Sequence, residues 1–466
     1  MEQNNKNIIT AIDSFDDNGL DSYANVLRDT QEYLSQFEKD LINTVKTNRP
    51  GEEVEKENAL KDAIREFIVT NNIQCDKVPD REVLTQRLFD SMVRFDFLTP
   101  YILDDAFILE HGIEEINGNA WNEIYITDKT GKHLLDESFC SPEQALTVMS
   151  SLATKLDKTL NEGTPIFLGE IKKNVRIACV SKPIVDPEKV VQFSIRIVSI
   201  KTIKRDDFIK YGTYSEDELN LLEVLVENDV SVLFAGAVNS GKTASMNYLL
   251  SYLTKDAKKR TTTIEIEARE FNLPKYDENG KAINDTISWR TRENMDGTKN
   301  IDANKLEELA LRFSQQVIGI GEMRNKEAMI TCEIATTGNT VITTTHSKDA
   351  RSAYDRVVAL CKKAQLGYDD ATLYRLAVEA FPIIAFQRLY PADRKRVCTE
   401  IIEGIGYENG KVYTRTLYAF ERDPNIADKT VGKHVFKNNI SNELMKILID
   451  NGVTTEQLNK IIKVDK

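Results

Sequence analysis

The chain has 466 residues, of which 41% are hydrophobic and 29% are charged. A chain of this length is expected to form two or three compact domains, each with its own core. Its formal net charge of −13 repels phosphate backbones over much of the surface, which argues against a dedicated nucleic-acid-binding protein without excluding a local basic channel. Recognition of protein partners is favoured.

The sequence carries no sign of a membrane span or of a zinc site. No stretch approaches the roughly 18 to 20 consecutive apolar residues that a spanning helix needs, and the start of the chain lacks the pattern of a secretory signal. We therefore expect a cytoplasmic protein. The cysteines form no CxxC pair and no Cys/His cluster, so we expect core thiols in a reducing compartment. They are Cys75, Cys140, Cys179, Cys332, Cys361 and Cys398.

Two segments are expected to precede the main domain. Residues 1–80 are polar and rich in charge, and stretches such as EVEKENALKDAIREFI predict an extended helical arm that ends before Pro79. Over residues 86–205, short strand-like runs (EIYIT, VRIACV, VVQFSIRIV) lie between helical ones, and Ser141 is placed to cap the helix SPEQALTVMSSLATKL. This second segment is predicted to be a separate α+β domain.

An α/β domain is predicted over residues 206–430. It begins near SEDELNLLEVLVEND, where Ser215 and Glu218 have the spacing of a capping box. Strand-like runs (SVLFA, TTTIEI, QVIGI, TVITTT, PIIAF) then alternate with helical segments, which predicts a parallel sheet with crossover helices. The polar segment 275–300 is expected to be an insertion outside the sheet. An antiparallel β-extension and a helical tail over residues 431–466 complete the chain.

The clearest chemical signal is the loop GAVNSGKT, which matches GxxxxGK[ST] between a buried-looking strand and a helix. In such a P-loop, glycines let backbone N–H groups converge on a phosphate, the lysine neutralises phosphate oxygens and the threonine offers a hydroxyl to Mg²⁺. Asn239 suits a left-handed loop position. A chance glycine-rich turn is the alternative. The residues predicted to bind ATP are Gly236, Ala237, Val238, Asn239, Ser240, Gly241, Lys242, Thr243 and Ala244, with Thr243 as a metal ligand.

Acidic residues follow two other predicted strands. QVIGIGE ends in Glu322, which can polarise an attacking water, although it can also be an ordinary solvated strand end. TTTIEIEARE carries Glu265, Glu267 and Glu270, which can hold magnesium through water or assist Glu322, or can be a solvated β edge. His346 ends the run TVITTTHS, where it can sense the γ-phosphate; a structural role is the usual alternative for a lone histidine.

In this order, the motifs GAVNSGKT, TIEIEAREF, VIGIGEMRNKEA and TGNTVITTTHSKDA resemble the secretion-ATPase superfamily, the hexameric motors of type II and type IV secretion and of type IV and Tad pilus assembly. The resemblance covers about residues 86–420, and the branch of type IV secretion and Tad-like motors is the most similar. It implies a RecA-like P-loop ATPase domain behind an α+β N-terminal domain, ATP and Mg²⁺ as ligands, and a homo-hexamer. It also implies a peripheral place at the inner face of the membrane, reached through membrane-embedded partners.

The resemblance implies roles for single residues. Glu322 is the catalytic carboxylate, Glu265 and Glu270 belong to the acidic box, with Glu265 close to the metal, and His346 is the His-box residue. Arg196 in FSIRIV matches an N-terminal-domain arginine that reaches nucleotide. Further candidates for charge on the phosphates, within or between subunits, are Arg176, Arg290 and Arg292, each with a surface arginine as the alternative. The chain departs from the family pattern at Ile266, Asn339 and the pair Gln315–Gln316.

Two other functions stay open beside the motor. A RecA-like nucleic-acid motor shares the P-loop sheet but needs a basic, aromatic-bearing channel, and the compact basic run at 394–396 is expected to be the solvated tip of a β-turn. A nucleotide-dependent scaffold with little turnover would not need Glu322. The acidic N-terminal arm is a candidate contact for membrane-protein partners, with a merely solvated helix as the alternative. No sequence-specific nucleic-acid binding is expected, and the cargo stays open between DNA, protein and pilin.

Overall fold

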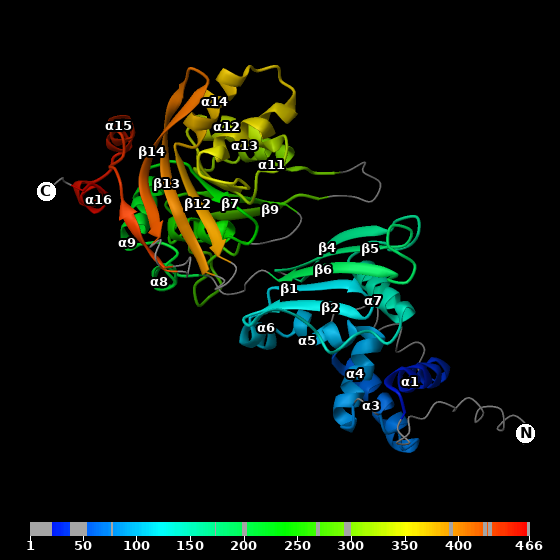
Figure 1. The fold of residues 1–466 in the computed structure, drawn as a ribbon. Coiled ribbons are helices and arrows are strands. Elements are labelled where there is room, and N and C mark those ends of the chain that lie inside the picture. The colour runs from blue at the N-terminus through cyan, green and yellow to red at the C-terminus, as the bar shows by residue number, and fades with distance from the viewer. Residues whose placement is uncertain are drawn as a thin grey trace, which may run out of the picture. The chain divides into compact units, whose positions relative to one another are not determined.

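The computed structural model describes residues 21–37, 54–75, 78–172, 174–197, 203–266, 271–292, 300–390, 395–422, 426 and 431–463. Its contacts divide the chain into two compact units, residues 1–200 and residues 201–466 (Figure 1). Each unit contains two clusters of buried apolar side chains. Every helix in the described ranges is too short or too polar to cross a lipid bilayer.

The first part of unit 1 is a packed helical cluster. Its helices are α1 (Tyr23–Phe37), α3 (Val54–Thr70) and α4 (Arg81–Val93). Their apolar faces close on one core, in which Leu34, Leu60 and Ile64 have no exposed surface. The prediction of an extended arm is therefore wrong for these described helices. A helix with an apolar face gains free energy by burying that face, and here the three helices bury one another's.

The second part of unit 1 is a six-stranded antiparallel sheet in the order β3-β2-β1-β6-β5-β4. Strict alternation along the strands sends Ile177 and Ile195 into a core with α7 and turns Arg176 and Arg196 to the other face. The Ser141 side chain caps α7 as predicted. The elements are η1 (Asp96–Leu98), α5 (Thr99–Leu103), α6 (Asp105–His111), β1 (Glu115–Ala120), β2 (Glu123–Asp128), β3 (Gly131–Leu134), α7 (Pro142–Lys155), β4 (Ile166–Lys172), β5 (Val175–Ser181) and β6 (Val191–Ile197).

Unit 2 is built on a nine-stranded sheet in the order β15-β14-β13-β12-β7-β11-β10-β8-β9. The strands from β12 to β9 run parallel to their neighbours, and β13, β14 and β15 are added antiparallel. The fold class is α/β, as predicted. The strands are β7 (Val232–Gly236), β8 (Thr261–Glu265), β9 (Thr286–Arg290), β10 (Val317–Ile320), β11 (Thr340–Thr345), β12 (Ile383–Tyr390), β13 (Lys395–Glu408), β14 (Lys411–Arg422) and β15 (Gly432–Phe436).

Helices cover both faces of this sheet. Alternate residues of β7 enter different cores: Phe234 packs with α9, α10, α15 and α16, whereas Leu233 packs with α11 to α14. Burial on both faces explains why the central strands are continuous apolar runs in the sequence. The helices are α8 (Arg205–Lys210), α9 (Glu216–Glu227), α10 (Lys242–Leu253), α11 (Ala303–Ala310), α12 (Glu327–Thr336), α13 (Ser352–Cys361), η2 (Lys362–Ala364), α14 (Asp370–Ala380), α15 (Asn442–Asp450) and α16 (Thr455–Ile461).

Strand β9 contradicts the sequence prediction. Part of the segment expected to be an insertion, Thr286–Arg290, forms β9 at the edge of the sheet, parallel to β8. Trp289 packs against the core while its neighbours stay partly exposed. An edge strand buries few side chains, so its five residues lack the apolar run that marks the inner strands.

The C-terminal residues are part of the core of unit 2. The two helices predicted there are present as α15 and α16, and they bury Leu444, Leu448 and Ile461 in the same cluster as α9 and α10. The prediction of a helical tail over residues 431–466 is wrong for Gly432–Phe436, which forms strand β15 and pairs with β14. Residues 432–461 therefore support the sheet from which the loop after β7 projects.

A buried histidine ties β15 to the start of α9, whose predicted capping box of Ser215 and Glu218 is present. His434 Nδ1 lies 2.8 Å from Oε2 of the fully buried Glu218, and Nε2 lies 3.2 Å from the carbonyl oxygen of Gly212. Both partners only accept hydrogen bonds, so the charged imidazolium satisfies both. Burial by itself lowers the pKa of His434, but the hydrogen bond and the charge of Glu218 outweigh it and raise the pKa above 6.5.

This contact is expected to make the stability of unit 2 depend on pH. A folded-state pKa that is raised gives stability that is fully present below the unfolded value of about 6.5 and is lost as the pH rises through the folded value. We expect His434→Gln to lower the melting temperature by about 2 to 4 °C more at pH 6 than at pH 9. The exposed His133 provides the matched control, His133→Gln. Equal losses for His434→Gln at both pH values would contradict the assignment.

Candidate functional site

The loop between β7 and α10 has three residues in the left-handed half of backbone space. They are Gly236 (φ 147°), Asn239 (φ 61°) and Gly241 (φ 97°), so the expected left-handed conformation of Asn239 is present. A Cβ on Gly236 would lie 2.2 Å from the carbonyl oxygen of Gln387, so only glycine fits there. The Ser240 hydroxyl donates to the carbonyl oxygen of Ala237 at 2.9 Å and closes the loop. A glycine-rich turn that leads into a helix N-terminus is a natural anion-binding site.

The parallel strands bring the predicted site residues to one edge of the sheet. In register, Ala235 of β7 lies beside Thr345 of β11, and Ile320 of β10 lies beside Thr343. The carboxyl ends of parallel strands share an edge, and ligands bind outside that edge in open α/β sheets. The residues at or just beyond the strand ends are Gly236, His346, Glu322, Glu265 and Arg290.

Lys242, His346 and Glu322 lie in one chain of close contacts at this edge. Lys242 Nζ lies 2.7 Å from the carbonyl oxygen of Ala237, 3.1 Å from that of Gly236 and 3.3 Å from His346 Nδ1. His346 Nε2 lies 3.1 Å from Glu322 Oε1. An ammonium only donates, so Nδ1 of His346 accepts in the bond from Lys242.

The same imidazole also contacts the loop backbone. His346 Nδ1 lies 3.1 Å from the carbonyl oxygen of Gly236. The ring therefore touches the loop backbone, the loop lysine and the acid at the end of β10. The structure thus brings together residues that are distant in the sequence. Lys242 and His346 lie 104 positions apart, and Glu322 and His346 lie 24 positions apart.

Glu322 has a further partner that was not predicted from the sequence. The second carboxylate oxygen, Oε2, lies 2.8 Å from Arg324 Nη2. The Arg324 side chain is 51% exposed, so solvent screens this ion pair, and we expect about 1 kcal/mol or less from it. Its signal was present in the motif VIGIGEMRNKEA, two residues after the acid. Glu322 itself keeps only 17% of its side-chain surface exposed, which leaves a small opening to water.

Glu265 lies at the end of β8 and is 2% exposed. Its Oε2 accepts a hydrogen bond from the Phe271 backbone N–H at 2.9 Å. The alternative of a solvated β edge is therefore wrong for this residue. Glu267 and Glu270, the other predicted acids, lie outside the described residues. Within the described ranges, no three or more His, Cys, Asp or Glu side chains gather as a metal-binding group.

The predicted arginines fall into two places. Arg290 ends β9 in register with Glu265, and Arg292 follows in a short bridge to Ile301. Arg176 and Arg196 belong to unit 1, where they are direct cross-strand partners on β5 and β6. Like charges opposite each other are unfavourable, and in this register each arginine has a glutamate as its next neighbour, Glu170 beside Arg176 and Glu115 beside Arg196. The structure thus joins two candidates that are 20 positions apart in the sequence.

A buried polar network under the loop was also missed. Gln387 on β12 lies in register with Gly236 and has no exposed surface. Its Nε2 donates to Ser245 Oγ at 2.7 Å and to Tyr214 Oη at 3.0 Å, and Tyr214 donates to Ser245 at 3.0 Å. The one signal in the sequence is a glutamine that follows the apolar run PIIAF. Buried amide groups need hydrogen-bond partners. The bond from Gln387 to Ser245 supplies one and holds the first turns of α10 against β12.

The basic run at 394–396 was predicted to be the solvated tip of a β-turn. This prediction is wrong for Arg396. Arg394 lies outside the described residues, but Arg396 is the second residue of β13, and its Nε donates to the carbonyl oxygen of Asn239 at 2.9 Å. The prediction failed because the partner lies 157 positions earlier in the chain. One residue of the basic run is therefore a neighbour of the loop.

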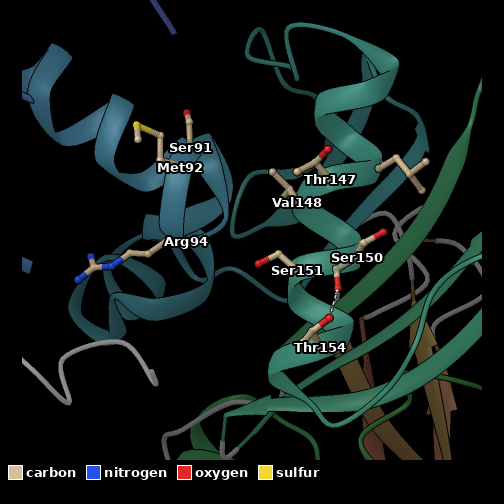
Figure 2. A pocket seen from close by; sticks show the side chains of 9 residues that line it. Ser91, Met92, Arg94, Thr147, Val148, Ser150, Ser151 and Thr154 are labelled. Atoms are coloured by element: carbon tan, nitrogen blue, oxygen red, sulfur yellow. Dashed lines mark hydrogen bonds between the residues drawn. The ribbon is translucent and has the colours of Figure 1, made fainter. Parts of the chain in front are cut away.

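A pocket in unit 1 carries less chemistry. It has a volume of about 450 Å³ between α4 and α7, and Figure 2 shows hydroxyl side chains around it. Its charged lining residue, Arg94, is already paired with Glu57 at 2.8 Å. The lining residues are Ser91, Met92, Arg94, Leu146, Thr147, Val148, Ser150, Ser151 and Thr154. The edge of the unit 2 sheet is therefore the stronger candidate site.

Comparison with known proteins places the chain in a family. The model of the family described as "Type II/IV secretion system protein" matches residues 143–417. The chain belongs to this family. The resemblance to the secretion-ATPase superfamily that was inferred from the motifs is thereby confirmed.

Individual relatives are distant. The chain is 25% identical over 288 residues to an uncharacterized protein of Methanocaldococcus jannaschii; the match covers 62% of this chain and 48% of that protein, so this chain spans about half its length. It is 23% identical over 327 residues to the conjugal transfer protein TrbB of Rhizobium radiobacter, covering 70% of this chain and 92% of TrbB. The solved structure of the ATPase DotB of Legionella pneumophila aligns with a TM-score of 0.45 and 18% identity, covering 63% of this chain and 78% of that chain.

Proposed function

We propose that this protein is an ATP-hydrolysing motor that powers a secretion, conjugative-transfer or pilus-assembly machine at the cytoplasmic face of the membrane. The observation that carries the proposal is the chain of Lys242, His346 and Glu322 beside the loop between β7 and α10. Membership of the type II/IV secretion family supports the kind of machine. Similarity to a conjugal transfer protein supports a function in a machine of this kind.

The sheet of unit 2 is proposed to be RecA-like. Its order supports this, because β11 lies between β7, which carries the loop, and β10, which leads to Glu322. His346 follows that intervening strand and so stands between the lysine and the acid. We infer that the γ-phosphate of ATP takes the position between these three side chains.

The residues present fit ATP with magnesium. Thr243 offers a hydroxyl in the first turn of α10, and Glu265 and Glu322 end neighbouring strands. Hydroxyl and carboxylate oxygens are the hard ligands that Mg²⁺ shares with phosphates. When bound, the ion neutralises charge on the β- and γ-phosphates.

The chain's own side chains divide the remaining work. Lys242 leaves the carbonyl oxygens of its loop to neutralise the phosphates, for which its ammonium carries three donors. Glu322 orients a water and accepts its proton. His346 contacts both Lys242 and Glu322. It can therefore respond to the presence of the γ-phosphate between them. Charge from the arginines, within one chain or across a subunit interface of a homo-hexamer, completes the site: Arg176, Arg196, Arg290 and Arg292.

The proposal is tested by phosphate release from ATP by the purified chain. We expect release that requires Mg²⁺ and stops with a chelator, and that single-stranded or double-stranded DNA leaves unchanged. Strong stimulation by DNA would favour a nucleic-acid motor, which the binding of Arg396 to the loop argues against because it removes one cation from the basic run. ATP binding without any release, with membrane partners present, would identify a scaffold. Light scattering with a nonhydrolysable analogue checks for the hexamer.

A further inference from the structure

A long side chain from β13 reaches the loop across an intervening strand. Arg396 pairs in register with Leu389 of β12, and β12 in turn lies beside β7. Two strand spacings are roughly 10 Å, a gap that short side chains do not cross. Arg396 nevertheless donates from Nε to the Asn239 carbonyl oxygen at 2.9 Å. Its stem also packs on the loop, because a Cβ on Gly241 would lie 3.2 Å from Arg396 Cδ.

The residue that Arg396 holds has an unusual backbone conformation. Asn239 has φ 61°, a left-handed conformation that costs free energy in any residue with a side chain. A trans peptide points its C=O and N–H in opposite directions. A guanidinium that fixes the Asn239 carbonyl oxygen on one side therefore turns the N–H of Ser240 to the other side. That N–H is one of the loop donors available to an anion.

We propose that Arg396 is a positioning residue that clamps the loop between β7 and α10 in its phosphate-binding conformation. The proposal deepens, and rests on, the function proposed above. Gln387 on β12 lies beside Gly236 and bonds to α10, and Arg396 on β13 holds the loop, so two neighbouring strands support the loop. The clamp lowers the cost of ordering the loop when a nucleoside triphosphate arrives, which is the ordinary benefit of preorganisation.

The geometry requires arginine rather than any cation. The bond is made by Nε, partway along the side chain, while the stem packs on Gly241. A lysine keeps the charge, but its donors lie only at the end of the stem and do not form a rigid fork. Arg396→Lys and Arg396→Gln are therefore expected to behave alike. Arg388 is the matched control, because it lies on the neighbouring strand β12 and is exposed, with its guanidinium over the ring of Phe386.

The experiment measures ATP hydrolysis and loop dynamics in the full chain. We expect both Arg396 variants to raise KM for ATP about tenfold, the effect of losing one charge-assisted hydrogen bond, while kcat stays within about threefold. Amide hydrogen exchange in residues 237–241 is expected to rise about tenfold without nucleotide in both variants, and Arg388→Gln is expected to match the wild type in each measurement.

Several outcomes would overturn the clamp. These are unchanged KM and unchanged exchange, a fall in kcat at constant KM, or wild-type behaviour of Arg396→Lys, which would mean that charge alone matters. If the glutamine variant fails to fold, the lysine variant supplies both measurements. A wild type that neither binds nor hydrolyses ATP would remove the proposed function, whereas the exchange comparison would still decide whether Arg396 orders the loop.

Discussion

Lys242→Ala is expected to reduce ATP hydrolysis to background and to weaken ATP binding at least tenfold. Lys242 carries the one charge of the GAVNSGKT motif, and the residue is only 6% exposed. A preorganised cation in a partly dry site is worth more than one in water, and loss of one such group commonly lowers the rate by about 10² to 10³. Hydrolysis is measured as phosphate release and binding with a fluorescent ATP analogue.

The control for Lys242→Ala is the replacement of another lysine by alanine, which changes the net charge by the same amount. Lys258 is suitable because its side chain is 84% exposed, and Lys258→Ala is expected to keep full activity. Removing Lys242 also strips hydrogen bonds from two loop carbonyl groups, so the melting temperature of each variant is measured alongside. A folded Lys242→Ala protein that hydrolyses ATP at the wild-type rate would mean that the loop is not the phosphate site.

Glu322→Gln is expected to separate binding from hydrolysis. Glutamine keeps the shape of the side chain and its contact with His346 at Oε1, so the affinity for ATP should change less than threefold. It cannot take a proton from water, and loss of a general base lowers the rate by about 10² to 10⁴. Single-turnover phosphate release together with the fluorescent analogue gives both quantities.

An exposed glutamate in the neighbouring helix serves as the control for Glu322. Glu333→Gln on α12 removes the same charge from the surface and is expected to hydrolyse ATP like the wild type. Equal activity of Glu322→Gln and the wild type would remove the acid from the mechanism. Equal inactivity of the wild type, Lys242→Ala and Glu322→Gln in the presence of partners would support the scaffold.

Much of the site was predictable because its signals are local. The loop, the strand before it and the helix after it occupy about twenty consecutive residues. Asn239 and the glycines are residue types that readily adopt the positive φ angles that the turn needs. Parallel strands also follow a simple rule: what comes after each strand gathers at one edge. That rule was enough to place Glu322 and His346 near the loop.

The misses have a common cause. The amphipathic pattern of residues 54–70 does predict a helix, but it does not say which surface covers the apolar face, and so the packed cluster with α1 and α4 was mistaken for an arm. Strand β9 buries too little to show a pattern. Arg176 and Arg196 were separate candidates until the register of β5 and β6 made them neighbours.

The sequence by itself determined the α/β class, the glycine-rich turn between β7 and α10 and the family, because these depend on periodicity and on short runs of residues with special backbone needs. The tertiary structure alone decided which distant side chains serve the loop: Arg396 from β13 and Gln387 from β12. The physical reason is strand order. Packing of the helices on both faces selects that order, and only then do β13 and β12 come to lie beside β7, within reach of a loop some 150 residues earlier in the chain.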